Sequence, residues 1–191
     1  MRRLYVLFLL LAFSRSFFGQ WDVKVYSWET AKLASPDTIF GITFSKSKLK
    51  ILPEELKAFN QLKHLDLSKN DLTDLPAYIG DLDSLIYLDI SKNDFSIFPV
   101  EICRLSNLST LVANRNSFSE LPECIGYCKK LSVIDLWSTP VTSFPKSFSE
   151  LKSLKMLDLQ GNRYSPTFHR KLIETLPWVE IKLDPPCDCM E

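Results

Sequence analysis

The chain has 191 residues, of which 46% are hydrophobic and 24% are charged, a composition that excludes a fibrous or intrinsically disordered protein and fits a single globular domain. The 23 basic and 23 acidic side chains give a formal net charge of zero, which argues against nucleic acid or an anionic membrane as the partner.

The first segment has the pattern of an export signal. Two arginines near the start are followed by an uninterrupted apolar run over residues 4–13 and then by small polar residues. Because a membrane-spanning helix needs about 20 apolar residues, we expect residues 1–19 to be a signal peptide that is removed after Ser16 or after Gly19. The protein would then be secreted or extracytoplasmic and would not insert into a membrane. The alternative is an uncleaved N-terminal helix, amphipathic or buried.

Residues 20–38 are expected to form an N-terminal cap. Ser27 precedes the segment 28–33, and a serine hydroxyl can accept a hydrogen bond from a free backbone N–H at the start of a helix. The Ser35-Pro36-Asp37 sequence ends this segment. A short capped helix is therefore predicted ahead of the main body of the chain.

A single pattern recurs from residue 39 to residue 166. Six segments of the form LxxLxLxxNxLxxLPxxIxxLxx follow one another at a spacing of 23 residues, and they open at Ile39, Leu62, Leu85, Leu108, Leu131 and Leu154. An unbroken period of this length indicates stacked structural units, each of which buries its apolar face against its neighbours.

This pattern resembles the leucine-rich-repeat family, in particular short, secreted, bacterial-like members with 23-residue repeats, over about residues 39–183. The resemblance implies an α/β solenoid. We expect a curved horseshoe segment with a parallel β-sheet on its concave face, short helical or irregular segments on its convex face, and small helical caps at both ends. The resemblance also implies binding of another macromolecule, but it does not name the partner.

The polar residue after each predicted strand is expected to hydrogen-bond the backbone of neighbouring units and so to form a ladder. Four units have asparagine there: Asn70, Asn93, Asn116 and Asn162. Ser47 replaces it in the first unit, and Thr139 followed by Pro140 replaces it in the fifth. Because proline has no backbone N–H, we predict a local distortion at Pro140.

Phenylalanine is frequent, and most of it falls at positions expected to face the core. These residues are Phe44, Phe59, Phe95, Phe98, Phe118, Phe144 and Phe148. Packing therefore accounts for most of the aromatic content.

Residues 167–191 are predicted to contain the C-terminal cap helix, a last strand and a tail. The segment 167–175 has the apolar spacing of an amphipathic helix. The segment 178–183 follows as a strand, with Trp178 expected next to Met156 on the outward face. Pro185 and Pro186 end it.

Alternate residues of a strand face opposite sides, so the outward residues of stacked units form columns across the concave face. One column is acidic (Asp66, Asp89, Asp135, Asp158), and a neighbouring column is basic (Lys46, Lys69, Lys92, Arg115). Toward the C-terminal half, Tyr87, Val112, Val133, Trp137 and Met156 are expected to form an exposed apolar patch. The predicted partner-binding residues are His64, Asp66, Tyr87, Asp89, Val112, Asn114, Val133, Asp135, Trp137, Met156 and Asp158.

The alternative interpretation is that these columns bind nothing. Charged runs commonly only solvate a face, and the aromatic residues of the patch could serve packing alone.

The five cysteines are an odd number, so an exported monomer has at least one unpaired thiol. Cys128 occupies a leucine position and is expected to be buried. Cys103 and Cys124 lie on neighbouring convex segments, where a disulfide is geometrically possible. Cys187 and Cys189 lie in the acidic tail, where they could pair under strain, bridge to another chain or, most simply, have no role.

Catalytic patterns are missing from the sequence. His64 and His169 are the only histidines, and neither belongs to a nucleophile–base arrangement. We find no phosphate-binding glycine loop, metal-ligand spacing or serine elbow, so no cofactor, metal or enzymatic activity is expected.

The sequence therefore predicts a non-enzymatic, monomeric module that binds a protein or a glycan-bearing partner through the concave face. Two alternatives stay open. One is a structural envelope protein without a specific ligand, and the other is a cytosolic signalling adaptor, if residues 1–19 do not direct export.

Overall fold

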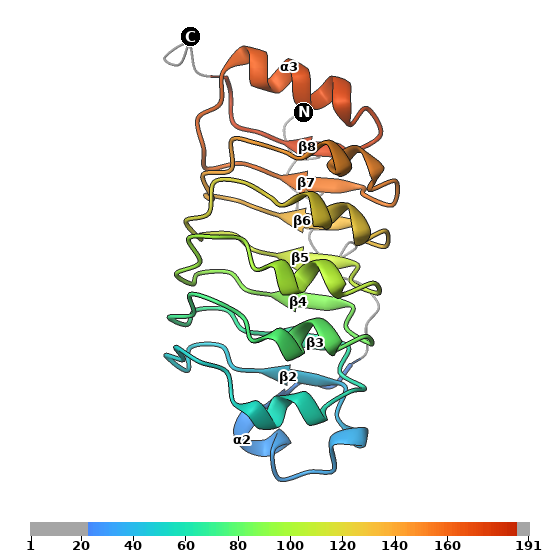
Figure 1. The fold of residues 1–191 in the computed structure, drawn as a ribbon. Helices are drawn as coiled ribbons and strands as arrows, with labels where there is room; N and C mark the ends of the chain where they lie inside the picture. Colours follow the sequence, from blue (N-terminus) through green and yellow to red (C-terminus); the bar gives the residue numbers. More distant parts are fainter. Residues whose placement is uncertain (1–22, 187–191) are drawn as a thin grey trace, which may run out of the picture.

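The computed structural model describes residues 23–186, so the predicted signal peptide and the cysteines at 187 and 189 lie outside the described residues. Within that range the chain forms a curved solenoid whose eight strands make one parallel sheet in sequence order (Figure 1). The strands are β1 (Tyr26–Ser27), β2 (Gly41–Thr43), β3 (His64–Asp66), β4 (Tyr87–Asp89), β5 (Thr110–Val112), β6 (Val133–Asp135), β7 (Met156–Asp158) and β8 (Glu180–Lys182).

Short 3-10 helices lie on the side of the solenoid opposite the sheet (Figure 1). They are η2 (Glu54–Ala58), η3 (Ala77–Asp81), η4 (Val100–Arg104), η5 (Glu123–Tyr127) and η6 (Lys146–Glu150). Each of them starts directly after the proline of its unit. Proline fixes φ near −65°, so it turns the chain into the helix at the same point of every unit. The predicted solenoid with a sheet on one face and short helices on the other is confirmed.

A single apolar core fills the space between the sheet and the 3-10 helices. Strand residues of successive units stack in register, and Leu65, Leu88 and Leu111 are paired and buried. The helices add Ile79, Ile102 and equivalents. Of the seven phenylalanines predicted to be in the core, six are buried, and Phe144 alone is partly exposed.

The asparagine ladder is present in the middle of the solenoid. The Asn93 amide donates hydrogen bonds to the carbonyl oxygens of Leu67 at 3.0 Å and Ile90 at 2.9 Å. Its Oδ1 atom accepts the N–H of Leu72 at 3.1 Å. One side chain thus satisfies backbone groups of two adjacent units, as Asn70 and Asn116 also do.

The ladder changes at Pro140, as predicted. The residues at the equivalent position, Asp94 and Ser117, each donate a backbone N–H to the preceding unit, and proline has no N–H to donate. The next residue, Val141, donates instead to the carbonyl of Thr139 at 2.7 Å in a tight local turn. The buried Thr139 hydroxyl donates to the carbonyl of Ala113 at 3.3 Å.

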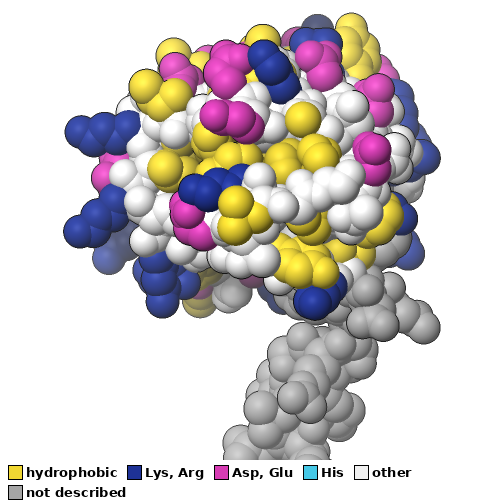
Figure 2. All heavy atoms as spheres, turned by 90° about the horizontal axis from the view of Figure 1, so that it is seen from below, with side chains coloured by type: hydrophobic (Ala, Val, Ile, Leu, Met, Phe, Trp, Pro, Cys, Tyr) yellow, Lys and Arg dark blue, Asp and Glu magenta, His cyan; other side chains and the backbone are white. Residues whose placement is uncertain are grey.

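The N-terminal cap consists of β1, helix α2 (Trp28–Ala31) and η1 (Pro36–Thr38). Helix α2 is shorter than predicted, and the predicted hydrogen bond from Ser27 to a backbone N–H is wrong. The Ser27 hydroxyl pairs with the hydroxyl of Thr30 at 3.0 Å instead. The Trp28 ring stacks on Phe44 at 5.1 Å and so covers the first unit. Viewed from this end, hydrophobic side chains gather in the middle of a charged rim (Figure 2).

The C-terminal cap is helix α3 (Pro166–Thr175) followed by β8. Ser165 starts the helix, because its hydroxyl accepts the backbone N–H of Phe168 at 3.2 Å. The predicted register of the last strand is wrong by two residues. Met156 pairs with Glu180, 24 residues further on, rather than with Trp178, 22 residues further on. The connection through α3 is therefore one residue longer than the repeat, whereas the prediction made it one residue shorter. Trp178 lies outside the sheet, and the Lys152 ammonium is 4.0 Å from the centre of its ring.

Candidate functional site

The predicted columns form on the open face of the sheet, because the strands pair in the expected register. His64 lies beside Tyr87, and Asp66 lies beside Asp89. Nine of the eleven predicted residues belong to strands β3 to β7, and Asn114 and Trp137 each follow a strand by two residues. The fold thus brings the predicted residues together on one surface, which we call the concave face.

An aromatic pair lies in the N-terminal half of the concave face. The His64 and Tyr87 rings are stacked, with centroids 4.3 Å apart and planes 6° from parallel. Burial lowers the pKa of His64 against the opposing effect of the Asp66 carboxylate. Burial, followed by the charges of Asp89 and Asp66, raises the pKa of Tyr87. Both rings are therefore uncharged at neutral pH, and they offer a flat, partly exposed surface with a polar atom at its edge.

The acidic column has a structural role in addition to its charge. In each unit, Oδ1 of the aspartate accepts the backbone N–H two residues further on, as Asp66 does from Ser68 at 2.9 Å and Asp158 from Gln160 at 3.0 Å. Asp89 and Asp135 make the same hydrogen bond. These aspartates therefore close the turn that leaves each strand.

For two of these carboxylates the surroundings disfavour the ionised form. Burial, with repulsion from Asp66 and Asp135, raises the pKa of Asp89. Burial also raises the pKa of Asp158. The acidic column is thus a line of partly desolvated negative charge that an opposite charge on a partner would stabilise.

A second cluster lies in the C-terminal half. The Arg115 guanidinium lies 4.5 Å from the centre of the Trp137 ring, within the range of a cation–π contact. The Asn114 amide donates to Oδ2 of Asp135 at 2.7 Å, and Oδ1 of Asp135 accepts the N–H of Trp137. The Arg115 guanidinium thus contacts the indole ring, and Asp135 fixes the backbone that carries it.

The residues of the basic column share a backbone conformation that was not predicted from the sequence. The residue before the ladder position is in the left-handed region in all six units, with φ from 53° at Arg115 and Ser138 to 62° at Lys46, and 80° at Gly161. The glycine at this position in the sixth unit was the available signal, because glycine adopts positive φ readily. The lysines and Arg115 are exposed there and project from the turn at the strand ends.

The predicted exposed apolar patch is partly wrong. Val112 and Val133 are only 8% and 9% exposed, although both lie on the outward side of their strands. Tyr87, Trp137 and Met156 are partly buried. The most exposed hydrophobic side chains lie elsewhere, among them Ile97 at 78% and Tyr127 at 72%. The accessible part of the concave face is therefore its rings and carboxylates rather than its aliphatic groups.

The convex face carries a disulfide between Cys103 of η4 and Cys124 of η5. This is the pairing that the positions of the two cysteines on neighbouring convex segments made geometrically possible. Cys128 is buried, as predicted, and its thiol donates to the carbonyl of Ile102 at 3.4 Å. Burial raises the pKa of Cys128 to about 11, so this thiol is unreactive at neutral pH.

Within residues 23–186, no group of three or more His, Cys, Asp or Glu side chains is placed to bind a metal ion. None of the helices described there combines the length and the apolar content that a membrane crossing requires.

Comparison with known proteins agrees with this architecture. A family model described as a leucine-rich repeat region matches residues 43–179. A leucine-rich-repeat protein of Leptospira interrogans has a similar structure, with a TM-score of 0.72, 29% identity, and coverage of 83% of this chain and 40% of that chain. An internalin of Listeria monocytogenes matches with a TM-score of 0.64, 18% identity, and coverage of 76% and 41%.

A plant structure is also similar. The ectodomain of a membrane receptor kinase of Arabidopsis thaliana, solved in complex with Casparian strip integrity factor 2, matches with a TM-score of 0.53, 26% identity, and coverage of 76% of this chain and 17% of that chain. The chain thus spans about two fifths of the length of the Leptospira and Listeria proteins and less of the plant receptor. No curated protein sequence matches the chain.

Proposed function

The chain belongs to the leucine-rich-repeat family, and we propose that it is a secreted, non-enzymatic recognition module that binds a protein partner through the concave face. The observation that carries this proposal is the arrangement of the His64–Tyr87 ring pair beside the carboxylates of Asp66 and Asp89 on an open sheet. Aromatic side chains with partly exposed faces are typical of the residues that contribute most to protein interfaces.

Two further observations support binding at this face. The Arg115–Trp137 contact provides a second ring, which the guanidinium holds in place. A side chain that is ordered before binding loses less conformational entropy when a partner arrives. The plant receptor ectodomain with the same fold was solved with a bound factor, and binding of a peptide or protein by this chain is part of our proposal.

The proposal of a non-enzymatic role rests on the chemistry of the concave face. His64 lies against a phenol ring on an open sheet, and burial holds its pKa below the usual value. Water-excluding pockets favour general acid–base catalysis, and the face around His64 is open. We therefore assign binding rather than turnover to these residues.

Secretion is supported by the cysteines as well as by the predicted signal. The disulfide between Cys103 and Cys124 is the kind of bond that persists in oxidising compartments and is rare in the cytosol. Mass spectrometry of the secreted protein should identify a mature chain that starts at Phe17 or Gln20. A full-length chain that keeps Met1 and is found in the cytosolic fraction would contradict secretion and favour the adaptor alternative.

The concave-face proposal is tested by affinity capture from the native surroundings with the wild type and three variants. Tyr87→Ala and Trp137→Ala remove one ring each from the concave face, and Tyr127→Ala removes an exposed ring from the convex side as the matched control. We expect a partner that is captured by the wild type and by Tyr127→Ala and that is lost or strongly reduced with the other two variants.

Circular dichroism must first show that the three variants are folded. Equal capture by all four proteins would show that the partner does not bind through the concave face. A wild type that captures no partner above the background of an unrelated repeat protein would favour the structural envelope role.

A further inference from the structure

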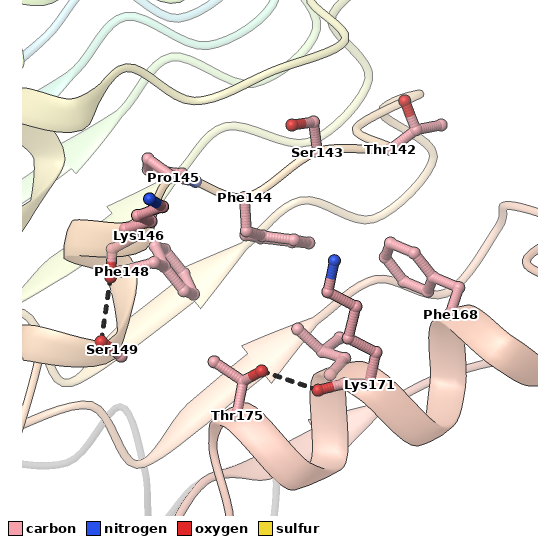
Figure 3. Close-up of a pocket in the computed structure, with 11 residues that line it drawn as sticks. Thr142, Ser143, Phe144, Pro145, Lys146, Phe148, Ser149, Phe168, Lys171 and Thr175 are labelled. Atoms are coloured by element: carbon pink, nitrogen blue, oxygen red, sulfur yellow. Dashed lines mark hydrogen bonds between the residues drawn. The ribbon is translucent and has the colours of Figure 1, made fainter.

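A groove lies between η6 and α3 at the C-terminal end of the solenoid (Figure 3). Its volume of about 520 Å³ falls within the range of about 300–1,000 Å³ that is typical of sites for small molecules. Its walls include Phe144, Phe148, Phe168 and Leu172. No residue of the concave face lines it, so it is separate from the surface proposed to bind a protein.

The groove exists because the repeat ends at this point. Phe144 belongs to a column whose earlier members, Leu52, Leu75, Phe98 and Leu121, are all buried under the following unit. The next helix after η6 is the wider α-helix α3 rather than another 3-10 helix. Phe144 is therefore only partly covered, although its ring packs 4.8 Å from Phe148 and 6.2 Å from Phe168.

The charged side chains that line the groove are both lysines. Lys171 and Lys146 line it, and no carboxylate does. In Figure 3 the side chain of Lys171 extends from α3 toward the space between Phe144 and Phe168. Among the described residues, neither lysine takes part in an ion pair.

The lysine at position 146 is specific to this unit. The equivalent positions in the earlier units hold Glu54, Ala77, Val100 and Glu123. The neighbouring Glu123 carboxylate accepts the backbone N–H groups of Lys146 and Ser147, at 3.3 and 3.1 Å, and does not line the groove. The lining thus includes two lysines, of which Lys171 is directed into the space between Phe144 and Phe168, and Lys146 lies at the other end of the groove beside Pro145 (Figure 3).

We propose that this groove binds a single-chain amphiphile with a carboxylate head, of the fatty-acid class. The alkyl chain would pack against Phe144, Phe148 and Phe168, which removes apolar surface from water. The carboxylate would pair with the Lys171 ammonium, and the ammonium of Lys146 adds to the same positive field. The hydroxyls of Thr142 and Ser143 lie on the same groove and are available as further donors.

The test is a titration of the purified protein with 11-(dansylamino)undecanoic acid, whose emission rises and shifts to shorter wavelength in an apolar site. We expect saturable binding and displacement of the probe by dodecanoate. Dodecan-1-ol and dodecyltrimethylammonium have the same chain length without the negative charge, and each should displace the probe much less effectively than dodecanoate.

The variants separate this groove from other apolar surfaces of the chain. Lys171→Glu should weaken binding by about tenfold or more, the change expected for roughly 1.4 kcal/mol, and Lys171→Arg should retain it. Arg170→Glu is the matched control, because Arg170 is the adjacent exposed residue of α3 and does not line the groove. Its affinity should stay close to that of the wild type.

Absence of saturable binding by the folded wild type would overturn the proposal. Equal losses in Lys171→Glu and Arg170→Glu would also overturn it, because they would indicate a diffuse charge effect. Equal displacement by the alcohol and by the carboxylate would rule out the assigned head group. None of these results depends on the protein partner of the concave face, so the two proposals can fail separately.

Discussion

The Asp89 carboxylate accepts the backbone N–H of Ser91 at 2.8 Å and so closes the turn at the end of β4. The same carboxylate has a raised pKa, because it is partly buried and lies near Asp66 and Asp135. The concave face therefore combines a stabilising hydrogen bond with an unfavourable charge in one side chain. Substitutions of Asp89 can separate the effect of the hydrogen bond from the effect of the charge.

Asp89→Asn should raise the free energy of unfolding at neutral pH. The amide oxygen can still accept the Ser91 N–H, and the repulsion with Asp66 and Asp135 is lost. Folding raises the pKa of Asp89, so its contribution to stability is fully present below about pH 3.8 and is lost as pH rises through the folded pKa. The advantage of Asp89→Asn should accordingly vanish at low pH.

Urea unfolding at pH 7 and pH 3 measures this difference. Asp89→Ala is the companion variant: it also removes the charge, but it leaves the Ser91 N–H without its acceptor, and it should be less stable than Asp89→Asn by about 1 kcal/mol. An Asp89→Asn variant that is less stable than the wild type at pH 7 would show that the carboxylate charge itself supports the fold.

The asparagines in the middle of the ladder should contribute more to the free energy of unfolding than the last one, Asn162. Asn93→Ala leaves the Leu72 N–H and the carbonyls of Leu67 and Ile90 without their partner in a buried place. Since one buried unsatisfied group costs about 1–3 kcal/mol, we expect a loss of about 3 kcal/mol. Asn162 is partly exposed and makes one long hydrogen bond of 3.4 Å, to Leu159.

Denaturant unfolding of Asn93→Ala and Asn162→Ala tests this order, with a loss below about 1 kcal/mol expected for the second variant. Similar losses in both would mean that the ladder contributes through the intrinsic turn conformation and not through its contacts to the adjacent units.

The part of the fold that could be predicted is the part that repeats. Register, core and ladder follow from a 23-residue period, because every unit must bury the same positions against its neighbours. The concave columns followed from the alternation of strand residues. The prediction of exposure failed at Val112 and Val133, since the alternation of strand residues gives the direction of a side chain and not the area that its neighbours cover.

The errors concentrate at the ends and at positions that depend on three-dimensional contacts. Trp178 was misplaced because the connection through α3 is one residue longer than the repeat, whereas the prediction made it one residue shorter. The groove at Phe144 was missed for the same reason: the phenylalanine pattern indicated a core position, and only the geometry of α3 shows that its cover is incomplete.

The disulfide should stabilise the middle of the solenoid. Cys103 and Cys124 are 21 residues apart, and closing a loop of this size lowers the entropy of the unfolded chain enough to contribute about 3 kcal/mol. The double variant Cys103→Ala, Cys124→Ala should lose about this amount under oxidising conditions. Reduction should lower the stability of the wild type and leave that of the double variant unchanged.

Peptide mapping without reduction provides an independent check of the pairing. The peptides that contain Cys103 and Cys124 should be found linked, and Cys128 should react with an alkylating reagent only after unfolding. A linkage between Cys128 and either of the other two would contradict the arrangement described here.

Leu176 tests whether the C-terminal cap supports the whole solenoid. Its side chain is buried at the end of α3, and Leu176→Ala should lower the free energy of unfolding by about 3 kcal/mol through lost burial and the cavity left behind. Ile173→Ala is the control on the same helix, because Ile173 is 54% exposed and its loss should change stability little. In a solenoid each unit is stabilised by its neighbour. Leu176→Ala should therefore also lower the hydrogen-exchange protection of the backbone amides in β4 and β5. If protection falls in α3 and β8 alone, the cap unfolds as a separate unit and the repeats do not depend on it.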